Sequence, residues 1–405
     1  IALTAETWQL ILGVHCYSLY SCVILWAKHI LLIAPSMMIL SLFLISFTKQ
    51  VTSSVPKNYQ HALALAFAVK EINENPKILP NLSLGFYILN SYYTARMTSK
   101  ATLSLLSTRN RFVPNFKCHN YKNLIAVIGG CLSQTSTNIE IISANHKIPQ
   151  VSSIRSHFPF LYQMVPNEGE QYKGIVRLLQ HFRWTWIGIG AVDDDKGDRL
   201  LQTIVPLLSQ KEPPSFQCLK ILLFLAPFLS LPPLAKVWIV TSHWDFESIS
   251  VQKIWDIQTF HGSLSTTVHS NQPLGFQEFL QTVKPSWAKG DGFIQDFWQQ
   301  SFGCYFKMSK GEEGSNNFCT GEEKLETLPG SLFEMRMFGH SYNVYSAVYA
   351  VAHALHALYG STSKYRRSLE RGNMPLMNIQ PWQVVKITLV LYLSYYITSL
   401  EMKTI

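Results

Sequence analysis

The run Leu124-Ile125-Ala126-Val127-Ile128 ends at Gly129-Gly130 and decides the fold class. A short apolar run bounded by glycine is typical of a strand that is buried on both faces of a parallel sheet. The polar residues 133–138 supply candidate caps for a helix, and Ile148-Pro149-Gln150-Val151 indicates another short strand after it. The order strand, polar turn, helix, strand predicts a doubly wound α/β sheet.

The same alternation continues on both sides of this segment. We expect helices over 58–73, 94–106, 175–182, 200–208 and 343–359, and strands over 82–88, 184–192, 237–240 and 260–267. The pattern fails between Cys218 and Ala235, where three prolines interrupt an apolar run over 221–234. Proline removes a backbone donor, so we expect neither a helix nor a central strand there.

Length and composition exclude several classes of protein. The chain has 405 residues, which predicts two to three domains of about 150 residues each. Hydrophobic residues make up 47% and charged residues 15%, and this composition excludes intrinsic disorder. The net charge is +9, but the lysines and arginines are scattered and lie beside acidic residues, so we expect no nucleic-acid partner.

Residues 8–47 are almost continuously apolar. Ile30 to Phe47 gives 18 uncharged residues, close to the lower limit for a helix that spans a membrane, and 8–27 is a second candidate. A cleaved signal peptide fits less well, because its apolar region is about 7–15 residues long. We therefore interpret residues 1–50 as an apolar leader that is either a membrane segment or non-native sequence from a faulty gene model.

Three groups of residues could bind a ligand or a metal ion, and each also has a purely structural interpretation. Gly129-Gly130 could offer backbone N–H groups to a carboxylate or phosphate, or form an ordinary tight turn. Asp193-Asp194-Asp195 could hold a divalent cation or a ligand ammonium, or cap a helix in solvent. His353 and His356 are three residues apart on one expected helix, where they could share a metal ion or pack among apolar neighbours.

The sequence has no zinc-type spacing of cysteines and histidines and no G-x-S-x-G or H-E-x-x-H motif. We therefore expect no enzyme activity, no metal and no cofactor. Cys304 and Cys319 bracket a polar loop of 14 residues, which indicates a disulfide in an oxidising compartment and free thiols in the cytosol. Asn81-Leu82-Ser83 is a glycosylation sequon if the chain enters the secretory pathway.

Several longer strings resemble one receptor family. They include HALALAFAVKEINENP at 61–76, HFRWTWIGI at 181–189, CTGEEKLETLPGSLFEM at 319–335 and GHSYNVYSAVYAVAHALHALY at 339–359. Over about 56–383 the chain resembles the extracellular ligand-binding module of vomeronasal type-2 pheromone receptors, within the family C G-protein-coupled receptors. The resemblance implies a bilobed, periplasmic-binding-protein-like "Venus flytrap", in which two α/β lobes with doubly wound sheets close on a small-molecule or peptide ligand.

On this resemblance, lobe 1 comprises 51–165 and returns over 268–383, lobe 2 is 166–267, and 384–405 is an apolar tail of unknown role. Several departures from the family pattern are expected, and two of them concern the sheets of the lobes. The first strand of lobe 1 is replaced by the apolar leader, and lobe 2 is missing a strand-helix unit near 221–234. The cysteine-rich and seven-helix domains of intact receptors do not follow Gln383, so we expect a truncated receptor.

The resemblance also assigns individual residues. It implies the disulfide between Cys304 and Cys319, in agreement with the spacing argument. It places a ligand site between the lobes, with Ser133 after the Gly-Gly strand, Glu168 at the interlobe crossing, and Lys196 and Ser242 on the lobe 2 rim. Lys196 and Ser242 stand where amino-acid-sensing relatives have an aromatic residue and an acid, which argues against a simple amino-acid clamp.

The expected function is therefore that of a ligand-binding ectodomain of a vomeronasal-type, pheromone-sensing receptor. Such a receptor dimerises through lobe 1 and lies at the plasma membrane with this region outside, and residues 8–47 are the candidate membrane contact. Two alternatives remain open at this point. One is a decoy that binds ligand without signalling, and the other is the product of a decayed receptor gene.

Overall fold

The structure is a computed structural model that describes residues 37–44, 56–80, 82–90, 94–106, 123–129, 133–152, 160–163, 168–184, 186–192, 195–209, 215–221, 237, 239–241, 262–286, 292–306, 317–368 and 382–384. The chain divides into two compact units. Unit 1 comprises residues 1–164 and 270–405, and unit 2 comprises residues 165–269. Both units contain helices and parallel strands, which confirms the α/β class. The bilobed arrangement stays a prediction.

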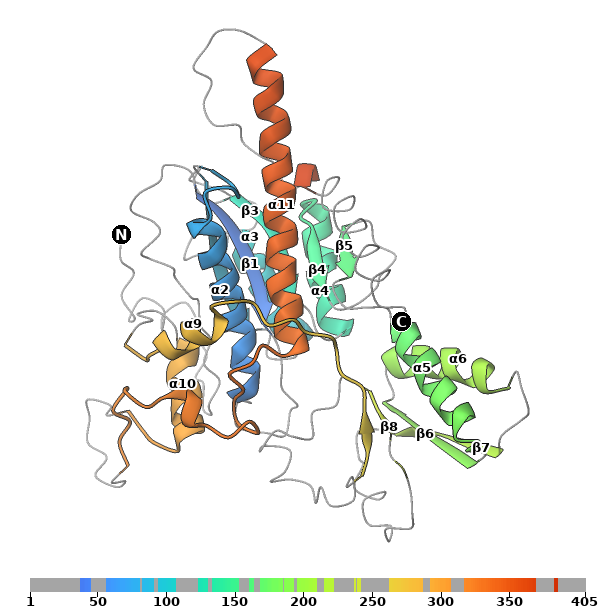
Figure 1. The fold of residues 1–405 in the computed structure, drawn as a ribbon. Coiled ribbons are helices and arrows are strands. Elements are labelled where there is room, and N and C mark those ends of the chain that lie inside the picture. Colours follow the sequence, from blue (N-terminus) through green and yellow to red (C-terminus); the bar gives the residue numbers. More distant parts are fainter. Residues whose placement is uncertain are drawn as a thin grey trace. The chain divides into compact units, whose positions relative to one another are not determined.

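Unit 1 is built on a five-stranded parallel sheet (Figure 1). In spatial order its strands are β2 (Ser83–Asn90), β1 (Met37–Leu44), β3 (Asn123–Gly129), β4 (Gln150–Ser152) and β5 (Leu161–Gln163). The run that opens the sequence argument forms β3, and each of residues 124–128 is buried. Because all five strands are parallel, their carboxyl ends lie at one edge of the sheet.

Strand β1 corrects two expectations from the sequence. We expected the apolar leader to replace the first strand of this sheet, and we offered 30–47 as a membrane-spanning helix. Residues 37–44 instead pair with β2 over their whole length, from Met37 with Ser83 to Leu44 with Asn90, and with β3 on the other side. A central parallel strand and a membrane helix both require an uninterrupted apolar sequence. The rest of 8–47 lies outside the described residues, and a membrane contact there stays a prediction.

Helices cover both faces of this sheet. Helices α2 (Tyr59–Glu74) and α11 (Gly339–Ser368) lie side by side against one face (Figure 1). Their apolar stripes, including Leu65 and Leu355, share a core with Ile125 and Ile128 of β3. Helices α3 (Ala95–Leu106) and α4 (Ser133–Asn145) pack against Leu124 and Val127 of the same strand. The side chains of β3 are therefore divided between two cores, as a doubly wound sheet requires.

A further part of unit 1 was not predicted from the sequence. Helices α9 (Phe276–Thr282) and α10 (Gly292–Phe302) and the 3-10 turn η4 (Leu325–Thr327) contribute to a second apolar cluster. The 3-10 turn η2 (Pro56–Asn58) contacts α10. The largest fully buried side chain of this cluster is Trp298, and the cluster includes Phe67 of α2. This cluster joins the earlier part of the chain's return segment, from Phe276 to Met337, to helix α2.

Unit 2 contains α5 (Glu168–His181), β6 (Trp186–Val192), α6 (Asp195–Ser209), β7 (Ser215–Ile221), β8 (Ile239–Val240) and β9 (Leu264–Ser265). Strand β6 pairs in parallel with β7, and β8 pairs in parallel with β9. Residues 218–221 continue β7, so the expected failure of the pattern from Cys218 onwards is wrong over these residues. Residues 222–236 lie outside the described residues, and the missing strand-helix unit stays a prediction.

Within the described residues, no helix has both the length and the apolar composition needed to cross a lipid bilayer.

Candidate functional site

The carboxyl edge of the unit 1 sheet brings together the end of β3 and the start of α4. Gly129, the last residue of β3, has a φ of 138°, which residues with a side chain rarely adopt. Helix α4 begins at Ser133, so the positive end of its dipole lies just beyond the strand. Ligands of open parallel sheets collect at such an edge. We define the β3–α4 edge by Gly129, Ser133, Ser136, Gln150 and Ser152.

Two side chains of β4 hold the first turn of α4. The hydroxyl oxygens of Ser136 and Ser152 are 2.6 Å apart, and one hydroxyl donates a hydrogen bond to the other. The side-chain nitrogen of Gln150 lies 3.4 Å from the carbonyl oxygen of Ser136 and 3.5 Å from that of Gly129. These long contacts bridge the strand and the helix weakly. All three side chains are buried, so water competes little for these bonds.

Gln150 also presents a buried acceptor at this edge. Its side chain is 1% exposed, and no group in the described part of the chain donates to its Oε1 atom. A buried acceptor without a donor costs about 1–3 kcal/mol. The nearby helix end favours a negative charge. The β3–α4 edge is therefore suited chemically to a polar ligand group.

Three of the four predicted ligand residues lie at the starts of helices. Ser133 is the first residue of α4 in unit 1, Glu168 is the first residue of α5 in unit 2, and Lys196 is the second residue of α6 in unit 2. Ser242 lies outside the described residues, as do Asp193, Asp194 and the sequon asparagine Asn81. The joint role of these residues in a ligand site stays a prediction.

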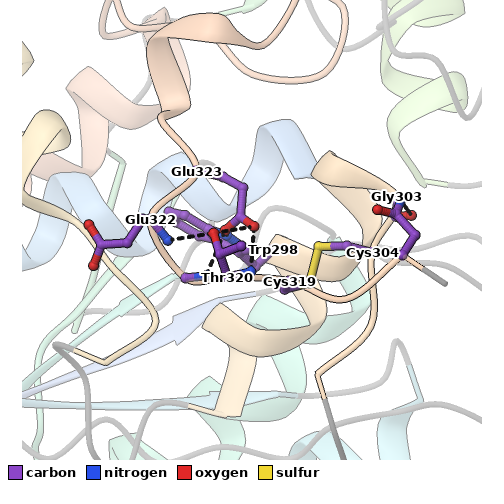
Figure 2. Close-up of a disulfide and its surroundings, with 9 residues drawn as sticks. Trp298, Gly303, Cys304, Cys319, Thr320, Glu322 and Glu323 are labelled. Atoms are coloured by element: carbon purple, nitrogen blue, oxygen red, sulfur yellow. Dashed lines mark hydrogen bonds between the residues drawn. A yellow bond between two sulfur atoms is a disulfide. The ribbon is translucent and has the colours of Figure 1, made fainter.

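Cys304 and Cys319 form a disulfide, with their Cα atoms 5.0 Å apart, which confirms the predicted pairing (Figure 2). The bridge joins Cys304, two residues after the end of α10, to the segment that precedes η4. Backbone hydrogen bonds support it, because Tyr305 donates to Asn317 and Cys319 donates to Tyr305, both at 3.0 Å. The disulfide therefore closes a loop at the edge of the second apolar cluster.

Glu323 organises the turn beside this disulfide (Figure 2). Its carboxylate accepts hydrogen bonds from the Trp298 indole N–H at 2.6 Å, from the Thr320 N–H and hydroxyl at 2.6 and 2.8 Å, and from the Gly321 N–H at 2.8 Å. Burial alone would raise the pKa of Glu323, but these hydrogen bonds, led by that of Trp298, lower it to about 2. Glu323 is therefore ionised at neutral pH and fixes the segment that covers Trp298.

His61 lies where the first turns of α2 and α11 meet. Its Nδ1 atom is 3.0 Å from the hydroxyl oxygen of Ser341, and Phe338 contacts its ring with the centroids 5.0 Å apart. Burial, and then the charge of the nearby His340, lower the pKa of His61 to about 3. His61 is therefore neutral in the folded chain at neutral pH.

The two histidines further along α11 have structural contacts. The backbone N–H of Leu79 donates to Nδ1 of His356 at 3.1 Å, and the His353 ring lies 6.1 Å from that of Tyr349. Burial, and then the charge of His356, lower the pKa of His353. Among the described residues, no group of three or more histidine, cysteine, aspartate or glutamate residues is placed to hold a metal ion.

Comparison with known proteins places this edge within a receptor module. Residues 60–212, which include β3, α4 and β4, match the receptor family ligand binding region. Mouse vomeronasal type-2 receptor 26 is 30% identical over 345 residues, which cover 74% of this chain and 40% of that receptor. The human extracellular calcium-sensing receptor is 26% identical over 407 residues, which cover 82% of this chain and 37% of that receptor. Mouse taste receptor type 1 member 1 is 25% identical over 376 residues, which cover 80% of this chain and 41% of that receptor. The chain thus spans about 40% of the length of these relatives.

Proposed function

The chain is related to vomeronasal type-2 receptors and to other family C G-protein-coupled receptors through their ligand-binding region, and from this premise we propose that it is the ligand-binding ectodomain of a vomeronasal-type, pheromone-sensing receptor. The observation that carries the proposal is the match of residues 60–212 to a receptor ligand-binding region over the elements that form the β3–α4 edge. The ligand in this proposal is a small molecule or a peptide with a polar group that this edge can bind.

Unit 1 and unit 2 contribute different groups in this proposal. The β3–α4 edge, with Ser133 and the start of α4, binds a negative or hydrogen-bonding group of the ligand. Glu168, Lys196 and Ser242 bind the rest of it. A ligand that binds the closed arrangement more tightly than the open one shifts the population towards closure, by no more than this difference in affinity. A dimer through lobe 1 then passes closure on to membrane helices at the cell surface.

The proposal can be tested by ligand-induced stabilisation of the full chain. The chain is secreted from mammalian cells, and its thermal unfolding is followed with synthetic peptides and free L-amino acids as probes. A probe at one hundred times its dissociation constant should stabilise the chain by about 2.7 kcal/mol. Because a hydrogen bond to a charged group contributes about 1.5–3 kcal/mol, Ser133→Ala and Glu168→Ala should each weaken an active probe about 10- to 100-fold.

The matched control is Ser104→Ala on α3. The Ser104 hydroxyl is exposed and donates only to the carbonyl oxygen of Ala101, one turn earlier. This variant should respond to an active probe as the native chain does. A probe that shifts the unfolding of the native, Ser133→Ala and Glu168→Ala chains equally would contradict the assigned site.

A further inference from the structure

Helix α5 of unit 2, which packs beside α6 (Figure 1), presents a row of basic side chains to solvent. Lys173, Arg177 and His181 are all exposed and follow one another at intervals of four residues. Residues four apart lie on the same face of a helix, so the three side chains form one stripe about 12 Å long. Val176 and Leu179 lie on another face of α5 and pack in the core of unit 2.

The positive charge of this stripe increases towards the end of the helix. Near the start of α5, Lys173 forms an ion pair with Glu170, with the two atoms 2.7 Å apart. Among the residues that the structure describes, no carboxylate forms an ion pair with Arg177 or with Arg183, which follows the helix. The acidic residues of α6 lie in its first turn, after the carboxyl end of β6, whereas Arg183 precedes the amino end of that strand. Two guanidinium groups can therefore bind an outside anion.

Arg183 occupies a backbone position that normally belongs to glycine. Its φ is 54°, its N–H donates to the carbonyl oxygen of Gln180, and the N–H of Trp184 donates to that of Leu179, both at 3.1 Å. These two bonds form a Schellman cap, in which the residue at the place of Arg183 is usually glycine because a side chain adds a steric cost. An arginine at such a strained position favours a role for its side chain outside the fold.

Two aromatic rings lie beside this arginine in the sequence and contact each other. The Phe182 side chain is 51% exposed, although phenylalanine is usually buried. Its ring stacks on that of Trp184, with the centroids 5.1 Å and the planes 18° apart, and the His181 ring lies nearly perpendicular to it, also with the centroids 5.1 Å apart. The end of α5 thus combines an exposed aromatic surface with two guanidinium groups.

We propose that this α5-end surface, defined by Arg177, His181, Phe182 and Arg183, binds a sulfated polysaccharide chain. Guanidinium groups bind sulfate oxygens through paired, charge-assisted hydrogen bonds, as they bind phosphate. The C–H face of a sugar ring is apolar and packs on an exposed aromatic ring, whereas a purely acidic peptide offers no such face. The disulfide of unit 1 indicates an oxidising, extracellular compartment, where sulfated polysaccharides rather than nucleic acids are the abundant polyanions. The inference goes beyond the proposed function, because it names a second partner whatever ligand the chain senses.

Binding of the full chain to heparin, measured by surface plasmon resonance at increasing NaCl concentrations, tests this inference. A protein that binds a linear polyanion releases counterions, so the slope of log affinity against log salt reports how many cations make contact. Arg177→Gln and Arg183→Gln should each weaken binding about fivefold and reduce the slope by about one. Phe182→Leu should weaken binding about threefold without changing the slope, because it removes an uncharged contact.

Arg183→Gly separates a loss of binding from a loss of folding. It should weaken heparin binding as Arg183→Gln does, while raising the melting temperature, because glycine suits a φ of 54°. If its weaker binding came from damage to unit 2, the melting temperature would fall instead, and that result would contradict the assigned role of Arg183.

Arg96→Gln is the matched control, because Arg96 is exposed on α3 of unit 1 and its replacement removes the same charge. It should leave heparin binding unchanged. Heparin without its sulfate groups, poly-L-glutamate and a thymidine oligonucleotide should each bind more weakly than heparin. The inference is overturned if heparin does not bind, if any of these three probes binds as tightly, or if Arg96→Gln weakens binding as much as the two α5-end variants. No receptor ligand is added, so the outcome does not depend on the proposed function.

Discussion

Acid should weaken the packing of α2 against α11 through one buried histidine. The pKa of His61 falls from 6.5 to about 3 because burial, and then His340, disfavour its charged form. Below pH 6.5 the unfolded chain therefore binds more protons at His61 than the folded chain does. The stability that neutral His61 contributes is complete above about pH 6.5, declines as the pH falls, and is lost at about pH 3.

Proton linkage sets the size of this effect. Each pH unit between the folded and unfolded pKa values costs about 1.4 kcal/mol. At pH 5.0 the folded chain should have lost about 2 kcal/mol relative to pH 7.5 from this residue alone. The loss is a sizeable fraction of the roughly 5–15 kcal/mol that stabilises a typical domain.

Native-state hydrogen exchange of the α2 amides measures this loss where it arises. The rates at pH 7.5 and 5.0, corrected for their intrinsic pH dependence, give the free energy of local opening at each pH. His61→Asn removes the titrating group and keeps a polar atom near Ser341. The native chain should lose about 2 kcal/mol more than this variant on acidification. His146→Asn, at an exposed position just after α4, should keep the native response.

The comparison uses only the change with pH, so the cost of the substitution at pH 7.5 cancels. If the native chain and His61→Asn respond to acid within about 0.5 kcal/mol of each other, His61 accepts a proton in the folded chain without penalty. That result would refute the argument from burial.

Three further predictions concern other contacts in unit 1. Replacing Cys304 and Cys319, which are 15 residues apart, with serine should cost about 3 kcal/mol of loop entropy, seen as a lower urea midpoint that reduction of the native chain reproduces. Glu323→Gln should lower the urea midpoint at pH 7, and this effect should disappear near pH 2. The pKa of Glu323 is about 2 in the folded chain in place of 4.5, so its carboxylate stabilises the fold fully above about pH 4.5 and loses this contribution as the pH falls through 2. Leu355→Ala should cost about 2–5 kcal/mol in urea unfolding because the side chain is 0% exposed, whereas Leu274→Ala, at a position that is 93% exposed, should leave the midpoint unchanged.

Local pattern was sufficient where the periodicity of an element fits only one kind of structure. The helical spacing of the apolar residues of α2, and the short apolar run of β3 bounded by glycine, predict a helix and a buried strand directly. Strand β1 could not be predicted in this way, because its eight residues, all apolar except Ser41, fit the centre of a parallel sheet as well as a lipid bilayer. Only its pairing with β2 and β3 distinguishes the two.

Helix α9 was missed for another reason, since its seven residues are too few to show a helical period. It is held by contacts of Phe276 and Phe279 with Phe67 of α2, more than 200 residues earlier in the sequence. Such contacts leave no local trace in the sequence.

Most of the contacts that organise unit 1 also join residues that are far apart in the sequence, and so could not be predicted from local patterns. The disulfide could be predicted because two cysteines bracket one short loop. The bonds of Glu323 to Trp298, of Gln272 to Met337 and of Gln60 to Phe338 join residues 25, 65 and 278 positions apart. Glutamine and glutamate are common on protein surfaces, so no motif marks those that are buried by a distant segment.

The pairing of α2 with α11 has a consequence for how the protein is made. About 260 residues separate the end of α2 from the start of α11, and the ribosome adds about 5–20 residues per second. The apolar stripe of α2 is therefore synthesised tens of seconds before α11, the helix that covers it, and the whole of unit 2 is synthesised in between. During this interval the nascent chain offers Leu65, Val69 and Ile72 to any chaperone that binds apolar segments, and release should coincide with the synthesis of α11.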